Sequence, residues 1–334
     1  MNSVKPTVRT LAQATGLSLA TVSRALAGSA SVLPATRDKV LQAARELHYV
    51  RDRAAVRLKT GRTQVVAFMM DRLDASQPGY KQLMLGIGDA LRDTDYHLIV
   101  LPDARDDDPL SGVRYVVDRG LADGLLLSHT TADDARVRYL LERGFPFVTH
   151  GRTRLAQSHA SVDFANEQFA ALAVDALVAR GRRELGILLP LPGSEFRDHL
   201  ADGFDAACAA RGVAGQRVLS VSLDDGPEAI YQWALREAGR FDGLVLSLEA
   251  PALPLLGALA DAQRLPGRDI DIVVKYSSDL PHYIRQPLIA CFEDLHLTGL
   301  TLGRQLLEQL LQPGQPPGQV LFTPPCLEHL HVKT

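Results

Sequence analysis

The chain has 334 residues, of which 46% are hydrophobic and 22% charged, a balance typical of globular proteins with buried cores. It has no apolar run of about 18 residues, which argues against a membrane-spanning helix, and its first residues, MNSVKPTVRTLAQ, lack the apolar stretch of a secretory signal. Its three widely spaced cysteines indicate no disulfide framework and fit a reducing compartment, so we expect a cytoplasmic protein.

Charge is distributed unevenly along the chain. Residues 1–62 contain 11 lysines and arginines and three acids, a net charge of +8 in a chain whose total is −3. The remaining residues therefore carry −11. A small basic segment beside a larger acidic one predicts that only the basic segment binds a polyanion.

Three short helices are predicted within residues 1–50. Thr7 can cap the first helix, and Gly16 can end it in a left-handed conformation. Ser18 can cap the second helix, which runs to about Leu26, and Pro34 suits the first position of the third. Two helices joined by a tight glycine-containing turn in a basic segment are typical of a helix-turn-helix DNA-binding head. A three-helix domain without this function also fits the pattern.

The second helix carries the side chains that we expect to contact DNA. Leu19 and Ala20 stand at its start and can meet thymine methyl groups in the major groove. Thr21 and Ser23 can hydrogen-bond phosphates, and Arg24 can make two hydrogen bonds to one guanine.

From Gln64 onward, apolar strand-like runs alternate with amphipathic helices, and the pattern restarts after Asp163. This alternation predicts an α/β body of parallel sheets covered by helices, in two similar lobes. We expect a head over 1–50, a linker over 51–62 and a body over 63–334, with lobes over 63–160 plus 291–322 and over 161–290 plus 323–334. Ligands of such folds bind at the carboxyl ends of strands, here between the lobes.

The segment TVRTLAQATGLSLATVSRALAGSASVLPATRDKVLQAARELHYV closely resembles the DNA-binding head of bacterial regulators of the lactose/galactose repressor (LacI) type. The α/β body matches the periplasmic-binding-protein-like core of that family. The matching residues are Thr7, Ala12, Gly16, Ser18, Thr21, Val22, Ser23, Arg24, Leu26, Gly28, Thr36, Arg37, Val40 and Tyr49.

This resemblance implies a homodimeric repressor of sugar-utilisation genes that binds a pseudo-palindromic operator. Its effector would be a small sugar, a mono- or disaccharide, bound between the lobes. An activator, or a regulator whose non-sugar ligand is a co-repressor, remains an alternative. A transporter-type solute-binding protein fits the body alone, but the basic head occupies the place of a signal sequence.

The resemblance also implies that residues 51–59 form a hinge helix in the minor groove of the operator. Thr7 of the head and Arg53, Ala55, Leu58 and Lys59 of the hinge would contact DNA, with Leu58 inserted between bases. The chain departs from the family pattern at Arg51-Asp52, where the hinge usually has Pro-Asn, and at Ala27, where it usually has asparagine.

The body also departs from the family pattern. Leu200 stands where an arginine usually grips the effector, and the nearest arginine is Arg197. Lys275-Tyr276-Ser277-Ser278 replaces the usual Gly-aromatic-Asp-Asp. With THGR at 149–152 and VDFANE at 162–167, this variant resembles the α-glucoside-utilisation branch of the family.

Polar groups at predicted strand ends, with aromatic side chains among them, are the candidates for effector binding. Because a buried lysine needs a partner, Lys275 is expected to pair with Glu249 or Glu293. The candidates are Asp71, Tyr80, Ser128, His150, Arg152, Asp163, Phe164, Asn166, Arg197, Glu249, Lys275 and Ser277.

Signatures of catalysis are absent from the sequence. It contains no GxxxxGK[ST] phosphate loop, no HExxH and no GxSxG motif. The terminal HLHV places two histidines on one strand without the further ligands that a metal needs. We therefore expect no enzyme activity, no cofactor and no metal, although an enzyme acting on a sugar or nucleoside is a remote alternative.

Overall fold

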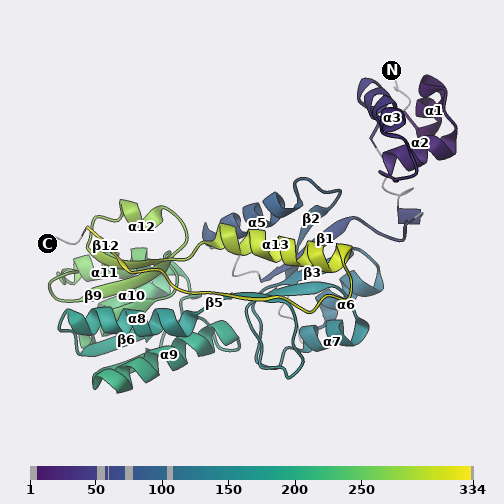
Figure 1. Ribbon diagram of the computed structural model, residues 1–334. Coiled ribbons are helices and arrows are strands. Elements are labelled where there is room, and N and C mark those ends of the chain that lie inside the picture. Colours follow the sequence, from purple (N-terminus) through teal and green to yellow (C-terminus); the bar gives the residue numbers. More distant parts are fainter. Residues whose placement is uncertain (1–5, 51–56, 59, 72–77, 104–107, 332–334) are drawn as a thin grey trace. The chain divides into compact units, whose positions relative to one another are not determined.

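The three helices of the head begin and end at residues suited to these positions. The computed structural model describes residues 6–50, 57–58, 60–71, 78–103 and 108–331 (Figure 1). The Thr7 side chain accepts a hydrogen bond from the backbone N–H of Thr10, and Ser18 accepts one from Thr21. Gly16 ends the first helix with φ 68°. The helices are α1 (Val8–Thr15), α2 (Leu19–Leu26) and α3 (Pro34–Glu46).

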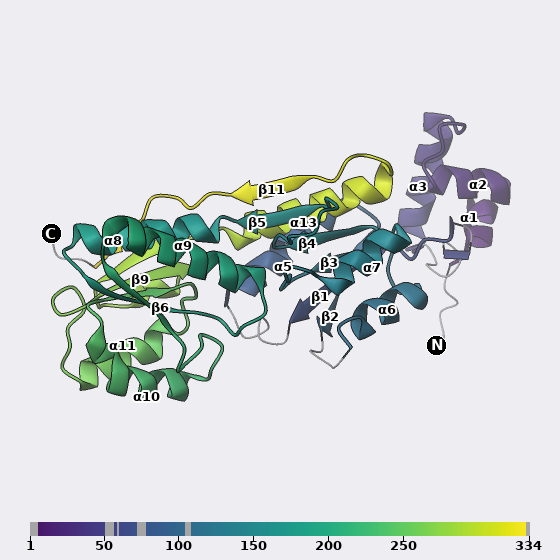
Figure 2. The same cartoon turned by 90° about the horizontal axis from the view of Figure 1, so that it is seen from below.

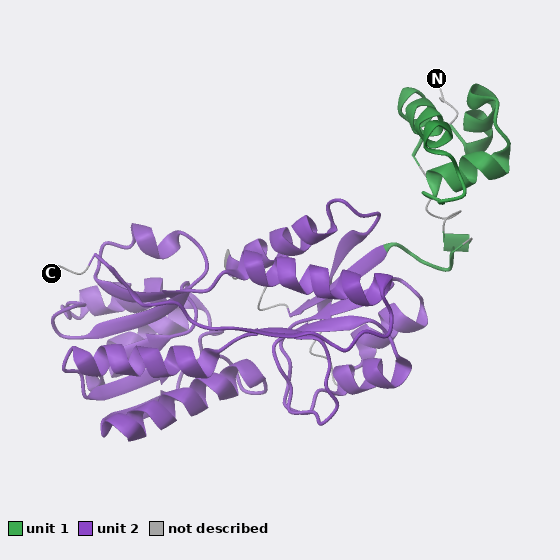
Figure 3. Cartoon of the chain, viewed as in Figure 1, with its two compact units in different colours: residues 1–64 green, residues 65–334 purple. Residues whose placement is uncertain are grey.

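A small apolar core holds the head together. It consists of the buried residues Leu11, Val22, Ala25, Val32 and Val40. The chain divides into two compact units, residues 1–64 and 65–334, which are coloured separately in Figure 3. The head therefore has its own core, as expected of a separate domain.

The second unit contains two six-stranded sheets. The first has the order β11-β5-β4-β3-β1-β2 and is parallel throughout. Its lobe comprises β1 (Val65–Asp71), α5 (Pro78–Leu91), β2 (His97–Asp103), α6 (Ser111–Asp118), β3 (Gly124–Leu127), α7 (Ala135–Arg143), β4 (Phe147–His150), β5 (Ser161–Phe164), α13 (Leu295–Leu311) and β11 (Gln319–Phe322).

The second sheet has the order β12-β10-β9-β8-β6-β7, and only β12 runs antiparallel to its neighbour. Its lobe comprises α8 (Asn166–Ala179), β6 (Glu184–Leu188), α9 (Glu195–Arg211), β7 (Ala214–Val218), α10 (Pro227–Glu237), a 3-10 turn (Ala238–Arg240), β8 (Gly243–Leu246), α11 (Ala252–Asp261), β9 (Asp271–Tyr276), α12 (Leu280–Tyr283), β10 (Leu288–Phe292) and β12 (Glu328–Leu330).

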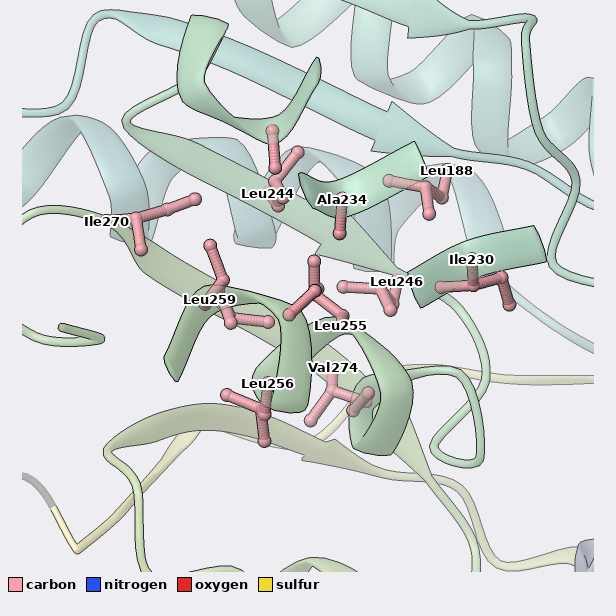
Figure 4. Close-up of a cluster of buried hydrophobic side chains, with 14 of the residues drawn as sticks. Leu188, Ile230, Ala234, Leu244, Leu246, Leu255, Leu256, Leu259, Ile270 and Val274 are labelled. Carbon is pink, nitrogen blue, oxygen red and sulfur yellow. The ribbon is translucent and has the colours of Figure 1, made fainter. Parts of the chain in front are cut away.

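Helices cover both faces of each sheet, as Figures 1 and 2 show. In the first lobe, α5 and α13 pack on one face, and α6 and α7 pack on the other. In the second lobe, α8 and α9 cover one face, and α10 and α11 cover the other, where the leucine-rich core of Figure 4 lies. Central strands such as β3 and β8 are buried at every residue, because both their faces are covered. The predicted α/β class with a helical head is confirmed.

The lobe boundaries differ from the expected ones by one strand at the first crossing and by part of β10 at the second, whereas the third agrees. β5 pairs with β4 and β11 and so belongs to the first sheet, although residues 161 onward were assigned to the second lobe. β10, at 288–292, lies wholly in the second sheet. The reason is the order of strands in the first sheet. The short run SVDF pairs with β4 on one side and with β11 on the other, and no local sequence pattern specifies this position.

No helix within the described ranges has both the length and the apolar character needed to cross a membrane.

Two glycines allow α5 and α13 to pack with backbones in contact. A Cβ on Gly299 would lie 2.0 Å from the carbonyl oxygen of Leu83, and a Cβ on Gly86 would lie 2.0 Å from that of His296. We expect Gly299→Ala to lower the free energy of unfolding by about 1–3 kcal/mol, because the helices must move apart. Gly88→Ala is the control: it lies on α5 with open space around it, and alanine there should stabilise by up to about 1 kcal/mol. Equal melting temperatures for the two variants would contradict the close packing.

Candidate functional site

A cavity lies where the two lobes meet, at the carboxyl ends of strands from both sheets. Its empty volume, including the part open to solvent, is about 800 Å³, a size typical of small-molecule sites. Six of the twelve predicted effector residues line it: Tyr80, His150, Arg152, Asp163, Asn166 and Lys275. Two of its polar groups, Asn166 and Glu293, lie where the chain leaves β5 and β10, so the cavity is coupled to the relative position of the lobes.

Arg152 connects the lobes at one side of the cavity. Its Nε lies 2.7 Å from Asp163 Oδ2 on β5, and its Nη2 lies 2.9 Å from Glu167 Oε2 in the first turn of α8. The same Nη2 lies 3.2 Å from His199 Nδ1 on α9. Burial alone would raise the pKa of Glu167, but hydrogen bonds from Arg152 lower it overall. The arginine is therefore held by acidic groups from both lobes.

The loop that carries Arg152 makes a second connection to α9. Arg154 Nε lies 3.0 Å from Glu195 Oε1, and Glu195 is almost completely buried in the first turn of α9. His199 Nε2 lies 3.2 Å from the other oxygen of this carboxylate. The backbone N–H of Glu195 also donates to the carbonyl of Thr130, in the loop after β3. These contacts connect loops of the first lobe to α9 of the second.

Lys275, at the end of β9, forms the floor of the cavity and is only 4% exposed. Its ammonium lies 2.6 Å from Glu293 Oε2 and donates to Asn166 Oδ1 at 2.7 Å. The rings of Phe164 and Phe196 lie 4.9 and 4.8 Å from the same nitrogen, at cation–π distance. A buried ammonium is thus matched by one carboxylate, one amide and aromatic faces.

The sequence left Glu249 and Glu293 as possible partners of Lys275. The structure pairs Lys275 with Glu293, and Glu249 has a different role. Its carboxylate accepts hydrogen bonds from the backbone N–H groups of Ser277 and Ser278 at 2.9 and 3.2 Å. It thereby fixes the turn after β9. Glu249 and Ser277 line a smaller adjoining cavity that shares Lys275 with the first.

Besides Glu249 and Ser277, four predicted residues lie outside the lining of the main cavity. Asp71 lines a separate cavity beside the ion pairs of Arg136. Ser128 is buried, and its hydroxyl donates to the carbonyl of Met69. The guanidinium of Arg197 donates to the carbonyl of Pro190. Phe164 does not line the cavity, but its ring contacts the Lys275 ammonium, which does.

Several lining residues were not among the predicted ones. They follow strands or begin helices in both lobes: His129, Thr130, Gly151, Pro190, Phe196, Asp224, Leu248, Glu293 and Leu295. The first two directly follow the apolar run DGLLLS, so the strand-end rule could have found them. Phe196 and Leu295 lie on helices, and no local pattern distinguishes them from core residues.

In the head, the start of α2 presents the predicted DNA-contacting side chains to solvent. Leu19 is 48% exposed and Ala20 is exposed, whereas Thr21 is half-buried, its hydroxyl 2.9 Å from that of Ser18. Arg24 is exposed, and its Nε donates to the carbonyl of Ala20 at 3.3 Å. Thr7, Ser18 and Ser23 complete the predicted set; the first two cap their helices.

Part of the predicted hinge helix lies outside the described residues, including Arg53, Ala55 and Lys59. Arg57 and Leu58 are described and have helical backbone. The Leu58 side chain is 90% exposed. Transfer of this exposed apolar side chain from water into an apolar environment would be favourable in free energy.

Comparison with known proteins shows the family. Residues 7–52 match "Bacterial regulatory proteins, lacI family", residues 63–236 match "Periplasmic binding proteins and sugar binding domain of LacI family", and residues 174–329 match "Periplasmic binding protein-like domain".

Similar proteins match along nearly the whole chain. The HTH-type transcriptional regulator AglR of Rhizobium meliloti (strain 1021) is 26% identical over 94% of this chain and 91% of its own. CelR of Thermobifida fusca is 26% identical over 92% of each. The fold is similar to that of two solved structures: the CelR–cellobiose complex, with a TM-score of 0.69, and the lac repressor dimer bound to operator and the anti-inducer ONPF, with a TM-score of 0.82. These two structures are 22% and 19% identical and cover 97% and 99% of this chain, and 98% and 100% of their own. The chain therefore belongs to the LacI family of bacterial regulatory proteins.

Proposed function

We propose that this chain is a cytoplasmic, homodimeric transcription repressor of sugar-utilisation genes, without enzyme activity, whose operator affinity is lowered by a sugar in the cavity between the lobes. The observation that carries this proposal is the cavity itself: its polar groups come from both lobes and from the crossings between them. The relative CelR is named in complex with cellobiose, and another relative, MalI of Escherichia coli, is named for the maltose regulon.

We propose that the ligand controls operator binding through the relative position of the two lobes, which the ion pairs of Arg152 and Arg154 connect. A ligand that binds between Asp163 and Lys275 has different affinities for the closed and open arrangements of the lobes, because Asp163 lies in the first lobe and Lys275 in the second. A ligand shifts a conformational equilibrium only through such differential affinity. We propose that this shift alters the dimer and the hinge residues 51–62, and so operator binding.

The test uses the purified full-length chain. Its melting temperature is measured with glucose, galactose, maltose, cellobiose and raffinose, and its binding to an operator selected from random duplex DNA is measured by fluorescence anisotropy. We expect one sugar to stabilise the protein, by about 2.7 kcal/mol at 100 times its Kd, and to weaken operator binding. Lys275→Met should abolish the stabilisation. A sugar that strengthens operator binding would be a co-repressor and would contradict the proposed mechanism.

Arg24 is expected to read a base directly. Arg24→Ala should weaken operator binding by about 1–3 kcal/mol and leave binding to random DNA almost unchanged, because only the operator offers the guanine. Arg9→Ala, an exposed arginine on α1, is the control for loss of one positive charge in the head. Equal losses on operator and random DNA for Arg24→Ala would contradict direct base recognition.

A further inference from the structure

We infer that the effector is an uncharged sugar, and that the cavity discriminates against acidic counterparts such as sugar phosphates, uronic acids and aldonic acids. This inference rests on the proposed sugar-binding function and specifies its ligand class. It follows from the charges that line the cavity and from how they are already paired.

Both cationic side chains among the described lining residues are engaged by carboxylates. Arg152 lies within 3 Å of Asp163 and of Glu167, which belong to β5 and α8. Lys275 lies 2.6 Å from Glu293 and is almost completely buried. An anionic ligand that used either cation would have to separate it from its partner and leave a poorly solvated carboxylate behind.

The described lining residues also carry an excess of negative charge. Against Arg152 and Lys275 stand Asp163, Glu293 and Asp224, and Asp224 is half-buried in the loop after β7. The lining therefore has a formal charge of −1 with its histidines neutral. The lining thus repels an anion.

Hydrogen-bonding capacity leads to the same conclusion. An ionised carboxylate accepts about four hydrogen bonds. Glu293 receives one from Lys275, and Asp163 receives one from Arg152 and one from the backbone N–H of Phe164. Both can accept more, so the cavity offers acceptors to a ligand that donates hydrogen bonds. Sugar hydroxyls donate, whereas phosphate and carboxylate oxygens at neutral pH only accept.

Apolar groups complete the match to a neutral sugar. Phe196, Leu248 and Leu295 line the same cavity, and the Tyr80 ring lies edge-on to His150 with centroids 6.3 Å apart. These surfaces can cover the C–H face of a pyranose ring while the acids bind its hydroxyl edge.

The experiment compares matched pairs of ligands on the full-length protein by calorimetry. Glucose is paired with glucuronate and with glucose 6-phosphate, galactose with galacturonate, and cellobiose and maltose with their aldonic acids. For the pair that contains the best-binding sugar, we expect the acid to bind about 10- to 100-fold more weakly, because the described lining residues carry a net negative charge. An acid that binds as tightly as its neutral counterpart would overturn the inference.

A charge-removing variant tests the cause. Glu293→Gln keeps an oxygen acceptor for Lys275 but removes the negative charge, so the preference for the neutral sugar should fall about tenfold or more. Glu308→Gln, on an exposed position of α13, is the control and should leave the preference unchanged. If Glu293→Gln does not fold, Asp224→Asn at the cavity tests the same direction. An unchanged preference in the variant would overturn the inference.

The outcomes separate the inference from the proposed function. If only acidic ligands bind, the sugar-responsive regulator stands and the neutral-ligand inference fails. If no member of any pair binds, the sugar effector itself is contradicted.

Discussion

Replacing Glu293 by alanine is expected to lower the free energy of unfolding by about 3 kcal/mol. The substitution leaves the Lys275 ammonium buried, with Asn166 as its remaining hydrogen-bond acceptor among the described residues. Removing one partner of a buried ion pair typically costs about 3–5 kcal/mol, and the lower value is appropriate because Glu293 is slightly exposed. The large effect comes from the unpaired charge rather than from the lost contact.

The double variant Lys275→Met/Glu293→Leu distinguishes these two causes. It removes both charges and keeps apolar volume between Phe164 and Phe196, so it should recover most of the lost stability. Urea unfolding can be followed by the fluorescence of Trp233, the single tryptophan, which is buried in the core of the second lobe. A loss below about 1 kcal/mol for Glu293→Ala would show that water reaches the lysine.

Replacing Arg136 by methionine should destabilise the first lobe to a similar or greater extent, by about 3–5 kcal/mol. The guanidinium is buried on α7 and lies 2.5 Å from Asp103 and 2.8 Å from Asp134. It also donates to the carbonyls of Ser128 and His129, at 3.1 and 2.9 Å. Methionine keeps the apolar stem but leaves two acids and two carbonyls without this donor.

The pH dependence of this effect has a definite sign. Burial alone would raise the pKa of Asp134, but the hydrogen bonds and charge of Arg136 lower it overall. A carboxylate with a lowered pKa stabilises the folded state above its unfolded pKa of 3.8, and this stability is lost as the pH falls through the folded value. The difference between wild type and Arg136→Met should therefore shrink as the pH falls below about 4. Burial raises the pKa of Asp103 despite the same guanidinium, so we assign the acid-dependent loss to Asp134.

Arg138→Met provides the matched control, two residues along the same helix. Arg138 forms an ion pair with Asp133 at 2.6 Å, but the two side chains are 52% and 66% exposed. An exposed pair of this kind contributes little, so the change in the free energy of unfolding should be within about 0.5 kcal/mol at any pH. Comparable losses for the two arginine variants would contradict the importance of burial.

The features that the sequence predicted well are those that depend on neighbouring residues. Thr7, Gly16 and Ser18 define the ends of two helices through contacts within four residues. Apolar runs such as DGLLLS and DGLVLS are strands because parallel strands are buried on both faces. Strand ends in turn located five of the cavity's residues, and the sixth, Tyr80, lies on α5.

Other features depend on residues that are far apart in the chain. Asp71 and Asp163 both lie at or near strand ends, yet Asp71 pairs in register with Asp103 of β2 and lines a different cavity. Asp163 lies on β5, whose place between β4 and β11 brings it to Arg152. Both aspartates follow apolar residues near the end of a strand, so the local sequence does not distinguish them. The order of strands in the sheet places them in different cavities.

The sequence by itself determined the head, the alternation of strands and helices, and the need of Lys275 for a partner. Only the tertiary structure decided that this partner is Glu293, that Glu249 instead fixes the turn after β9, and that Asn166, 109 residues away, completes the site. The physical reason is that helix caps and strand patterns arise from contacts along the chain. The ion pair between Lys275 and Glu293 instead depends on the pairing of β9 with β10, and the hydrogen bond to Asn166 depends on where the chain enters the second lobe after β5.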